Sequence, residues 1–439
     1  MKSNLINSIR KRNATICVIG CGYVGLPLAL RFAEKGFSVF ALDTDETKVS
    51  NILDGKSYID GITDRRIERT VAEGLVATSK FSVIKNAQAV IICVPTPLSS
   101  FREPDLSHVE DVLRLMEPYL NSGQLISFES TSYPGTTDEI FGSALKRKNF
   151  IIGENIFLAY SPEREDPGNS QYTTANIPKV VSGYTPACLE VGLALYECVV
   201  NEVVAVSTTK VAELTKLLEN IHRSVNIGLV NEMKIIADKM DIDIFEVINA
   251  AATKPFGFSK YLPGPGLGGH CIPVDPYYLS WKAREYGIAT KFIELAGEIN
   301  RNMPVWVIGK VVDALNSRHQ AVSGTSILVL GVAYKKDVAD VRESPGVEII
   351  KKLLALGAIV SFSDPVCDKD QLPPELSTVK QVEVTVSEIR KNSLLLIVTD
   401  HTLFDYDLIL FILPALTVSI LFFSLKIMFF KTPKLRKVK

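Results

Sequence analysis

Residues 15–25 read TICVIGCGYVG, and this stretch decides the fold. Its apolar first half, Thr15 to Ile19, predicts a buried strand that ends at Gly20. Helix-forming residues follow, and a second apolar run from Phe37 to Leu42 ends in Asp43. The order strand, glycine turn, helix and strand is typical of a βαβ unit in a parallel sheet.

Further apolar runs extend this pattern. Ala89–Val94 and Leu125–Glu129 predict two more buried strands, so we expect a parallel, doubly wound sheet. Residues 157–183 contain three prolines, and we expect them to be irregular. Apolar residues recur at helical spacing from Thr208 to Met240, which predicts one long helix that forms a spine or a dimer surface.

A second βαβ unit is expected near the carboxyl end of the chain. Its strands are predicted at Thr325–Gly331 and Val360–Ser363, its helix at Pro345–Leu356, and a further buried strand at Leu394–Thr399. The sequence therefore predicts an α/β protein with two Rossmann-like, doubly wound parallel-sheet domains joined by a long central helix. We expect three domains, at residues 1–205, 206–305 and 306–407, followed by an atypical tail at 408–439.

Composition excludes several classes of protein. A chain of 439 residues suggests two or three domains, and 47% hydrophobic with 22% charged residues is typical of a globular protein. A net charge of −1 gives no support for a broad nucleic-acid-binding surface. The seven cysteines form no CxxC pair, which favours reduced thiols over a disulfide scaffold. The first 13 residues lack the apolar core of a signal peptide, so we expect a cytoplasmic protein.

The glycine turn at residues 20–25 has the GxGxxG spacing of a dinucleotide-binding fingerprint. Gly20, Gly22 and Gly25 would let a pyrophosphate approach the backbone at the start of a helix. Asp43 can accept hydrogen bonds from both ribose hydroxyls and would repel a 2′-phosphate, so NAD is favoured over NADP. The alternative is a tight turn that binds no ligand.

A second glycine-rich loop, GPGLGG at residues 264–269, is followed by His270 and Cys271. So many glycines suggest that something packs tightly on this backbone. A cysteine near the start of a helix can be a stabilised thiolate, although a buried structural cysteine is the alternative. Asp275 lies four residues further on. His270 has no second His or Cys at ligand spacing, so we expect no metal site.

Two other groups of polar residues are candidates for catalysis. Lys216 and Asn220 lie four apart on the long helix and share a face, where they could bind an oxyanion; a solvated helix face is the alternative. Glu163 lies in the proline-bounded loop SPEREDPG at residues 161–168, which could be catalytic or ordinary surface.

Together these motifs resemble the UDP-glucose/GDP-mannose dehydrogenase family. The stretches that carry the resemblance are GCGYVGLPLA, ESTSYPGTTDE, AYSPEREDPGN, ELTKLLENIHRSVNIGLVNEMK, GPGLGGHCIPVDP and GVAYKKDVADVRESP, between about residues 14 and 407. GGHCIPVDP with the lysine helix is specific to the family. The SPEREDPGN and KPFGF stretches are similar to the N-acetylhexosamine branch, nearest to bacterial UDP-N-acetyl-D-glucosamine 6-dehydrogenases.

The resemblance implies oxidation of a sugar C6 hydroxyl to the acid by two NAD in turn, in the synthesis of a surface polysaccharide. It makes Cys271 the nucleophile that forms a thiohemiacetal and then a thioester. Lys216 would be the acid/base partner of the sugar oxygen, with Asn220 on the same oxygen. Asp275 would position Lys216 or its water, Glu163 would activate the hydrolytic water, and Thr131 is also placed in the catalytic set.

The resemblance also implies binding residues and a homodimer or higher homo-oligomer. The NAD-contacting positions are Gly20, Gly22, Tyr23, Val24, Gly25, Asp43, Lys48, Thr96, Thr131 and Arg342. The positions that contact the UDP-N-acetylhexosamine are Arg164, Glu165, Lys216, Asn220, Arg223, Lys254, Gly268, Tyr334 and Lys335. Some of these residues are expected to reach across the dimer.

The chain departs from the family pattern at about Leu408. Residues 408–425 contain 18 residues without a charge, interrupted by Pro414, and a basic segment follows. This length approaches a membrane span, but a basic carboxyl flank would place the catalytic body outside the cell. A change of reading frame that replaced the native ending is the preferred alternative. We therefore expect the closing strand of the last sheet to be missing and the new segment to pack loosely as a helix or protrude. An impaired, membrane-associated nucleotide-sugar-binding protein is the alternative function.

Overall fold

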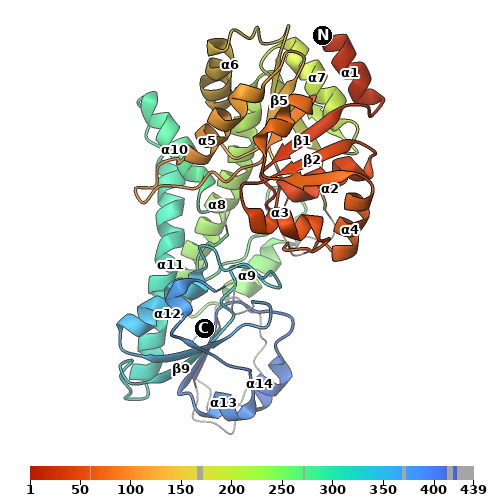
Figure 1. Ribbon diagram of the computed structural model, residues 1–439. Coiled ribbons are helices and arrows are strands. Elements are labelled where there is room, and N and C mark those ends of the chain that lie inside the picture. Colours follow the sequence, from red (N-terminus) through yellow and green to blue (C-terminus); the bar gives the residue numbers. More distant parts are fainter. Residues whose placement is uncertain (60, 166–171, 270–271, 368–371, 413–418, 423–439) are drawn as a thin grey trace. The chain divides into compact units, whose positions relative to one another are not determined.

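The structure of this chain is a computed structural model that describes residues 1–59, 61–165, 172–269, 272–367, 372–412 and 419–422. It contains two compact units (Figure 1). The first unit consists of Met1–Glu219 with Tyr277–Ile288, and the second of Asn220–Pro276 with Ala289–Lys439. The domain boundaries expected from the sequence stay a prediction.

The first unit is built on a sheet of eight strands in the order β3-β2-β1-β4-β5-β6-β7-β8. The strands are β1 (Thr15–Ile19), β2 (Ser38–Leu42), β3 (Leu75–Thr78), β4 (Ala89–Ile92), β5 (Leu125–Phe128), β6 (Phe157–Tyr160), β7 (Lys179–Gly183) and β8 (Val203–Ala205). All pairings are parallel except that of β6 with β7.

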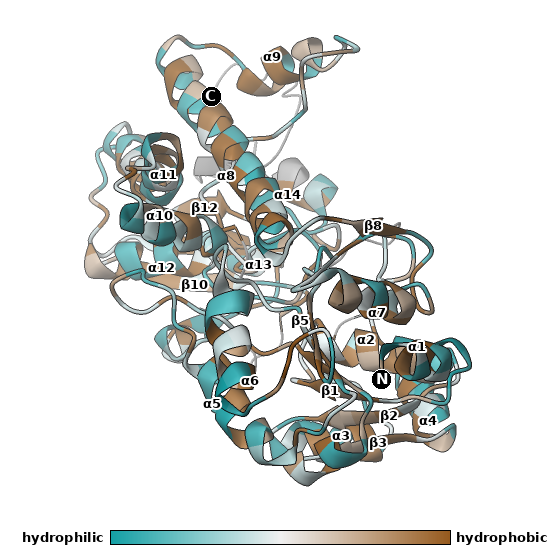
Figure 2. Ribbon diagram, turned by 90° about the horizontal axis from the view of Figure 1, so that it is seen from above, coloured by the Kyte–Doolittle hydropathy of each residue, from teal (hydrophilic) through white to brown (hydrophobic). Residues whose placement is uncertain are grey.

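Helices cover both faces of this sheet. Along β1, Ile16 and Val18 belong to one hydrophobic core, whereas Cys17 and Ile19 belong to the other. Strands buried on both faces read as continuous apolar runs, which is why the sequence located them. In Figure 2 the strands are largely hydrophobic.

The helices of the first unit are α1 (Lys2–Arg10), α2 (Gly25–Glu34), α3 (Glu46–Leu53), α4 (Asp64–Ala72), α5 (Ser107–Met116), α6 (Ser143–Arg147) and α7 (Pro186–Tyr196). Shorter 3₁₀ turns occur at η1 (Phe81–Asn86) and η2 (Glu117–Tyr119), and a π-helical turn at η3 (Thr137–Gly142).

The segment expected to be irregular, residues 157–183, begins and ends with strands. β6 and β7 pair antiparallel, with Ala159 opposite Gly183 and Tyr160 opposite Ser182. The prolines fall outside both strands, so they do not interrupt the ladder. The expectation was wrong because the prolines were taken to disrupt the whole segment.

The second unit contains the carboxyl half of α8 (Thr209–Lys239), followed by α9 (Ile244–Ala251) and α11 (Lys291–Asn316); α10 spans Asp275–Glu285. Two fully buried amides bridge the long helices, because Asn231 Nδ2 donates to Asn300 Oδ1 at 2.8 Å and Asn300 Nδ2 donates to the Ser224 carbonyl at 3.0 Å. Buried amides are tolerated where each finds a partner.

A parallel sheet of five strands completes the second unit, in the order β11-β10-β9-β12-β13. The strands are β9 (Ser326–Leu330), β10 (Ile359–Ser363), β11 (Lys380–Gln381), β12 (Leu394–Ile397) and β13 (Ser419–Phe422). Its helices are α12 (Pro345–Ala355), α13 (Val386–Arg390) and α14 (Tyr406–Ile412), with a 3₁₀ turn η5 (Pro374–Leu376). Val329 lies in the core under α11 and α12, and Leu328 and Leu330 lie in the core under α13 and α14.

The expectation that the closing strand of the last sheet is missing was wrong, because the tail supplies this strand. Residues 419–422 form β13, which pairs parallel with β12 from Leu394 opposite Ser419 to Ile397 opposite Phe422. The segment 419–422, SILF, is rich in β-formers, so it can occupy this edge. Residues 413–418 and 423–439, with the basic segment, lie outside the described residues.

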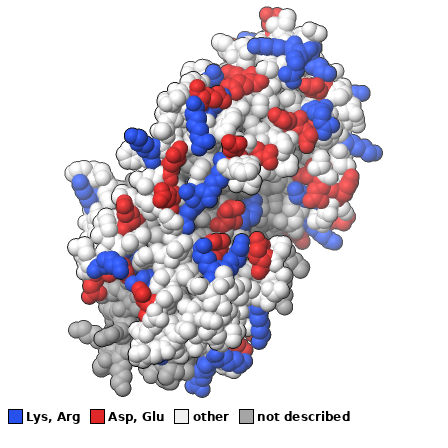
Figure 3. All heavy atoms as spheres, turned by 90° about the vertical axis from the view of Figure 1, so that its left-hand side faces the viewer, with Lys and Arg blue, Asp and Glu red and all other residues white. Residues whose placement is uncertain are grey.

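Within the described ranges, no helix has both the length and the apolar character needed to cross a bilayer. Acidic and basic side chains are interspersed over the face shown in Figure 3, in keeping with the net charge of −1.

We expect that ending the chain after Ile412 destabilises the second unit relative to ending it after Phe422. The shorter chain loses the four residue pairs between β12 and β13 and leaves β12 as an open edge. At about 0.5–1.5 kcal/mol per backbone hydrogen bond, the loss should be about 2 kcal/mol or more. Chemical unfolding and light scattering of the two truncated chains measure it. Equal stability and solubility would mean that β13 is dispensable.

Candidate active site

The first unit gathers most of the predicted residues at one edge of its sheet. The segments after β1, β2, β4, β5 and β6 carry Gly20, Asp43, Thr96, Thr131 and Glu163 respectively. The carboxyl ends of parallel strands meet at the same edge, and ligands of open α/β sheets bind there. Residues distant in sequence are therefore brought to one place by strand pairing alone.

The three glycines of the turn have different surroundings. Gly20 has φ +91°, and a Cβ there would lie 2.5 Å from the Cys93 carbonyl oxygen. A Cβ on Gly25, the first residue of α2, would lie 1.8 Å from the Gly20 oxygen. A Cβ on Gly22 would meet nothing within 4 Å. Gly20 and Gly25 therefore shape the turn, and Gly22 leaves open the backbone that a pyrophosphate would approach.

Asp43 is tied to this turn rather than exposed at the end of β2. Its Oδ2 accepts from the Cys21 N–H at 2.7 Å and its Oδ1 from the Asp45 N–H at 3.0 Å. Lys48 Nζ on α3 lies 3.3 Å from Asp43 Oδ2. Tyr23 and Val24 occupy the turn directly before α2, with Val24 at its N-cap. Thr96 is buried in the segment after β4.

Glu213 is a buried carboxylate that the sequence analysis did not include among the candidate site residues. It accepts from the backbone N–H groups of Gly135 at 2.5 Å and Thr137 at 2.8 Å, and from Thr137 Oγ1 at 2.7 Å. Burial raises the pKa of Glu213 to about 7 despite these hydrogen bonds. Glu213 lies on α8, one turn before Lys216. It thus anchors to α8 the segment that follows Thr131. A Glu inside an otherwise apolar stretch of the helix was the available signal.

Lys216 and Asn220 lie on α8 as predicted, and Lys216 is buried. The boundary between the two units falls after Glu219, so the two residues belong to different units. Within the second unit, Asn220 Nδ2 donates to Asp275 Oδ2 at 2.5 Å. Asp275 is buried at the start of α10. This pair orients the Asn220 amide; the expected contact of Asp275 with Lys216 stays a prediction.

The glycine-rich loop packs against the following domain. The Gly264 N–H donates to Asn231 Oδ1 at 2.9 Å, and the Gly269 N–H donates to the Arg342 carbonyl at 3.0 Å. A Cβ on Gly268 would lie 2.5 Å from Tyr334 Cβ, and one on Gly269 would lie 2.8 Å from the Tyr334 ring. The close partner that the glycines predicted is therefore this tyrosine. His270 and Cys271 lie outside the described residues.

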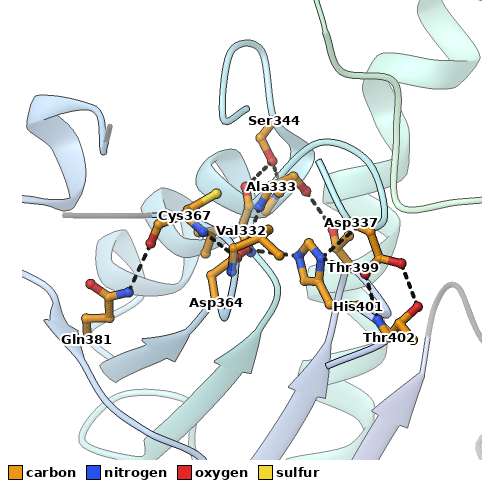
Figure 4. A network of polar contacts seen from close by, with 12 residues as sticks. Val332, Ala333, Asp337, Ser344, Asp364, Cys367, Gln381, Thr399, His401 and Thr402 are labelled. Carbon is orange, nitrogen blue, oxygen red and sulfur yellow. Dashed lines mark hydrogen bonds and ion pairs between the residues drawn. The ribbon is translucent and has the colours of Figure 1, made fainter. Parts of the chain in front are cut away.

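The loop that carries Tyr334 and Lys335 follows β9 and is held by a polar network (Figure 4). Asp364 Oδ2 accepts from the Val332 N–H at 2.7 Å, the Ala333 N–H at 2.9 Å and His401 Nε2 at 3.1 Å. Since His401 Nδ1 accepts from the Asp337 N–H at 3.0 Å, Nε2 carries the proton that it donates.

Burial alone would raise the pKa of Asp364, but hydrogen bonds from His401 and the backbone outweigh it and lower the pKa to about 2. The sequence analysis did not name Asp364 or His401. The signal for Asp364 was its place after the second strand of a βαβ unit, the place that Asp43 has in the first unit.

The remaining predicted residues have partners of their own. Arg164 pairs with Glu219 on α8 at 2.6 Å and donates to the Pro178 carbonyl at 2.7 Å. Glu165 accepts from Thr174 Oγ1. Arg223 is exposed on α8. Lys254 Nζ lies 5.1 Å from the centre of the Phe256 ring.

Arg342 belongs to the second unit, and its guanidinium pairs with Asp340 at 2.6 Å. Its predicted contact with NAD stays a prediction. Among the residues that the structure describes, no group of three His, Cys, Asp or Glu side chains could hold a metal ion.

Three family models match the chain in succession. They are the NAD binding domain of the UDP-glucose/GDP-mannose dehydrogenase family at residues 14–200, its central domain at 210–302 and its UDP binding domain at 328–412. The chain belongs to the UDP-glucose/GDP-mannose dehydrogenase family. The resemblance and the expected NAD-binding domain are thereby confirmed.

Individual relatives cover nearly the whole chain. Protein CapL of Staphylococcus aureus is 37% identical over 82% of this chain and 84% of its own. UDP-N-acetyl-D-glucosamine 6-dehydrogenase of Salmonella typhi is 33% identical over 85% and 87%. The structure of the UDP-D-ManNAc dehydrogenase of Pyrococcus horikoshii is similar with a TM-score of 0.83 and 29% identity, over 92% of this chain and 93% of that one.

The residues of the turn fit the NAD implied by this family. Gly22 leaves the backbone open, α2 has no acidic residue in its first turn, and Asp43 ends β2 with its carboxylate at the turn. The helix N-terminus and the glycine backbone would hold the pyrophosphate, and Asp43 would accept from the ribose.

We expect Gly22→Ala to affect NAD binding and Gly25→Ala to affect the stability of the fold. Gly22→Ala should leave the thermal unfolding midpoint almost unchanged but weaken NAD binding about tenfold or more, because its methyl group occupies the ligand's approach. Gly25→Ala should cost about 1–3 kcal/mol of stability, because its methyl group meets the Gly20 carbonyl. Calorimetry and NAD titration measure both. Unchanged NAD affinity in Gly22→Ala would contradict this assignment.

Asp364 should make the second unit sensitive to acid. Its pKa in the folded chain, about 2, lies below its ordinary value, so its stabilisation is complete above about pH 4 and is lost as the pH falls through 2. This stabilisation contributes about 2 kcal/mol to the free energy of unfolding. Urea unfolding against pH should show this loss, Asp364→Asn should remove it, and exposed Asp313→Asn is the control. An equal acid dependence in Asp364→Asn and the parent would contradict the assignment.

Proposed function

We propose that this protein oxidises the C6 hydroxyl of UDP-N-acetyl-D-glucosamine to the carboxylate, with NAD as oxidant in two successive steps. The observation that carries the proposal is the gathering of the glycine turn, Asp43, Thr131 and Glu163 at the carboxyl edge of the first sheet. The second unit supplies the Asn220–Asp275 pair and the domain that matches UDP-binding domains.

The first oxidation requires a base for the hydroxyl proton and a partner for the sugar oxygen. NAD, when bound, supplies the hydride acceptor for both oxidations. The buried Lys216 is the acid/base group in this proposal. Asn220, oriented by Asp275, donates to the same oxygen.

The second oxidation uses Cys271 as a covalent nucleophile. Its thiolate adds to the C6 aldehyde and forms a thiohemiacetal, and loss of a hydride from C6 converts this to a thioester. Water then attacks the thioester carbonyl, a C–O bond forms, the C–S bond breaks, and Glu163 takes the proton of the water. The thiolate returns, so two NAD are reduced for each acid formed.

The acetamido sugar is inferred from sequence stretches and relatives. SPEREDPGN and KPFGF are similar to the N-acetylhexosamine branch, and the relatives act on UDP-N-acetylglucosamine or on its mannosamine epimer. We favour the glucosamine form. The tail was the ground for an impaired membrane-associated protein as the alternative. Its residues 419–422 supply a strand to the last sheet, and on this support we favour the active enzyme.

We also infer a homodimer. In the second unit α8 leaves Leu229, Met233 and Ile236 exposed, and Met240, directly after the helix, is exposed as well. Their spacing places them on one side of the helix. A second copy of α8 would cover this apolar stripe.

The experiment that tests the function supplies purified protein with NAD and one of four sugars: UDP-N-acetylglucosamine, its mannosamine and galactosamine epimers, or UDP-glucose. NADH is followed by nicotinamide absorbance and the acid by mass spectrometry. We expect two NADH per acid and the highest kcat/KM with UDP-N-acetylglucosamine. A higher value with another sugar would refute the substrate, and no NADH with any of them would refute the function.

Cys271→Ser should reduce acid formation on the order of 10³-fold or more, because a serine hydroxyl is not ionised here and an alkoxide is a poorer leaving group. A bound intermediate can still form. Cys198→Ser is the matched control, since Cys198 is a half-buried free cysteine that follows α7 in the first unit and is not one of the proposed site residues. Normal acid production by Cys271→Ala would refute the thioester.

We expect NAD to bind more tightly than NADP because of Asp43. Asp43→Ala should weaken NAD binding about 10- to 100-fold, because a hydrogen bond to a charged group is lost. The difference in affinity between NAD and NADP should become smaller. Calorimetric titration of both cofactors measures it. Tighter binding of NADP by the unchanged protein would contradict the assignment.

A further inference from the structure

Two serines flank Thr131 in the segment that follows β5. The hydroxyls of Ser130 and Ser132 are buried and have no hydrogen-bond partner among the described residues. The Ser130 carbonyl accepts from Tyr160 OH at 3.2 Å, which fixes the start of the segment. Where Thr131 lies therefore depends on how the residues after it are held.

Tyr133, two residues after Thr131, is held by its ring. Only 7% of Tyr133 is exposed. The centre of its ring lies 5.1 Å from that of Trp281, and Lys282 Nζ lies 4.7 Å from the same ring centre. Trp281 and Lys282 are neighbours on the part of α10 that belongs to the first unit. The end of the Thr131 segment is thus packed against this helix.

Lys282 makes a second contact with the same stretch of chain. Only 4% of Lys282 is exposed, and its Nζ lies 2.9 and 3.0 Å from the two carboxylate oxygens of Glu139 in η3. Glu285, on α10 itself, lies 2.8 Å from the same Nζ. Burial would lower the pKa of Lys282, but hydrogen bonds to Glu285 and Glu139 outweigh it and raise the pKa, so the ammonium is charged. One ammonium therefore ties α10 to the ring of Tyr133 and to the carboxylate of Glu139.

The backbone between these two contacts is a braced turn. The Tyr133 carbonyl accepts from the N–H of Thr136 at 3.0 Å and from its Oγ1 at 2.7 Å. The Glu139 N–H donates to the Gly135 carbonyl at 2.8 Å. Glu213 on α8 holds the middle of this turn through the Gly135 N–H. Lys282 holds both of its ends, including the end that leads back to Thr131.

The order of the strands decides which half of NAD this segment would meet. Asp43 follows β2 on one side of β1, and Thr131 follows β5 on the other side. A pyrophosphate at the turn after β1 places the adenosine ribose on the side of Asp43. The nicotinamide half then extends across β4 toward the segment that carries Thr131.

We propose that Lys282 is a positioning residue for the nicotinamide half of the cofactor site: from α10 it holds Tyr133 and Glu139 and thereby sets where Thr131 lies. This rests on the proposed place of Thr131 in that site. Lys282 acts through the segment and not by contact with NAD. Without its ammonium, the segment keeps its hold on α8 but loses the ion pair and the cation–π contact that bind it to α10.

The test compares the binding of NAD with that of ADP, which keeps the adenosine and two phosphates but lacks the nicotinamide half. Lys282→Met should weaken NAD binding about 3- to 30-fold and change ADP binding less than about twofold. By charge alone, loss of an ammonium would weaken ADP more, because ADP carries the larger negative charge. A selective loss of NAD affinity therefore reports a displaced segment. Calorimetric titration measures both ligands, and thermal unfolding checks that each variant is folded.

Three further variants serve as controls. Glu285→Gln is the matched one, because it removes the lysine's partner on α10 and leaves the contacts with the segment, so both affinities should stay near the parent. Lys282→Arg keeps a cation over the Tyr133 ring and should restore most of the NAD affinity. Glu139→Gln weakens the ion pair from the other side and should lower NAD affinity selectively, by a smaller factor. The side chains of Glu139 and Glu285 are 47% and 50% exposed, so no buried carboxylate is left unpaired in Lys282→Met.

Equal losses of NAD and ADP affinity in Lys282→Met and Glu139→Gln would overturn the proposal, because Lys282 would then serve only the stability of the first unit. Unchanged NAD affinity in both variants would overturn it as well. If the parent binds NAD but forms no acid from any of the sugars, the proposed function fails, and the two titrations still decide the role of Lys282.

Discussion

Parallel pairing of buried strands is the constraint on which the site depends. Because β1, β2, β4, β5 and β6 run in the same direction, the segments after them meet at one edge. The backbone groups of those strands are satisfied by the ladder, so the segments beyond them are free to carry function. β7 and β8 run in the opposite direction, and this reversal brings the start of β7 to the same edge.

The same construction recurs in the second unit. Gly331 follows β9 as Gly20 follows β1, and a Cβ on it would lie 2.2 Å from the Thr399 oxygen after β12, as one on Gly20 would lie 2.5 Å from Cys93 after β4. Asp364 accepts from the turn after β9 as Asp43 accepts from the turn after β1. In both units a buried carboxylate fixes a loop that the ladder itself leaves free.

Glycines serve two purposes in this molecule, and sequence does not distinguish them. Gly22 is open, which suits a ligand. Gly268 and Gly269 are closed against Tyr334, so their lack of a side chain allows one segment of the chain to pack on another. This contact joins the loop at residues 264–269 to the loop after β9 within the second unit.

The sequence by itself determined the two βαβ units, the long helix and most of the candidate site, because doubly buried strands and glycine turns leave strong local signals. It did not reveal β7, where prolines nearby obscured a short strand, or β13, because strand formation there depends on an available edge beside β12. It also missed Glu213, Asp364, His401 and Lys282. Their roles depend on partners far away in the chain, such as Glu139 for Lys282. Only tertiary structure decides such pairings, since a buried charge acquires its role from what the fold places beside it.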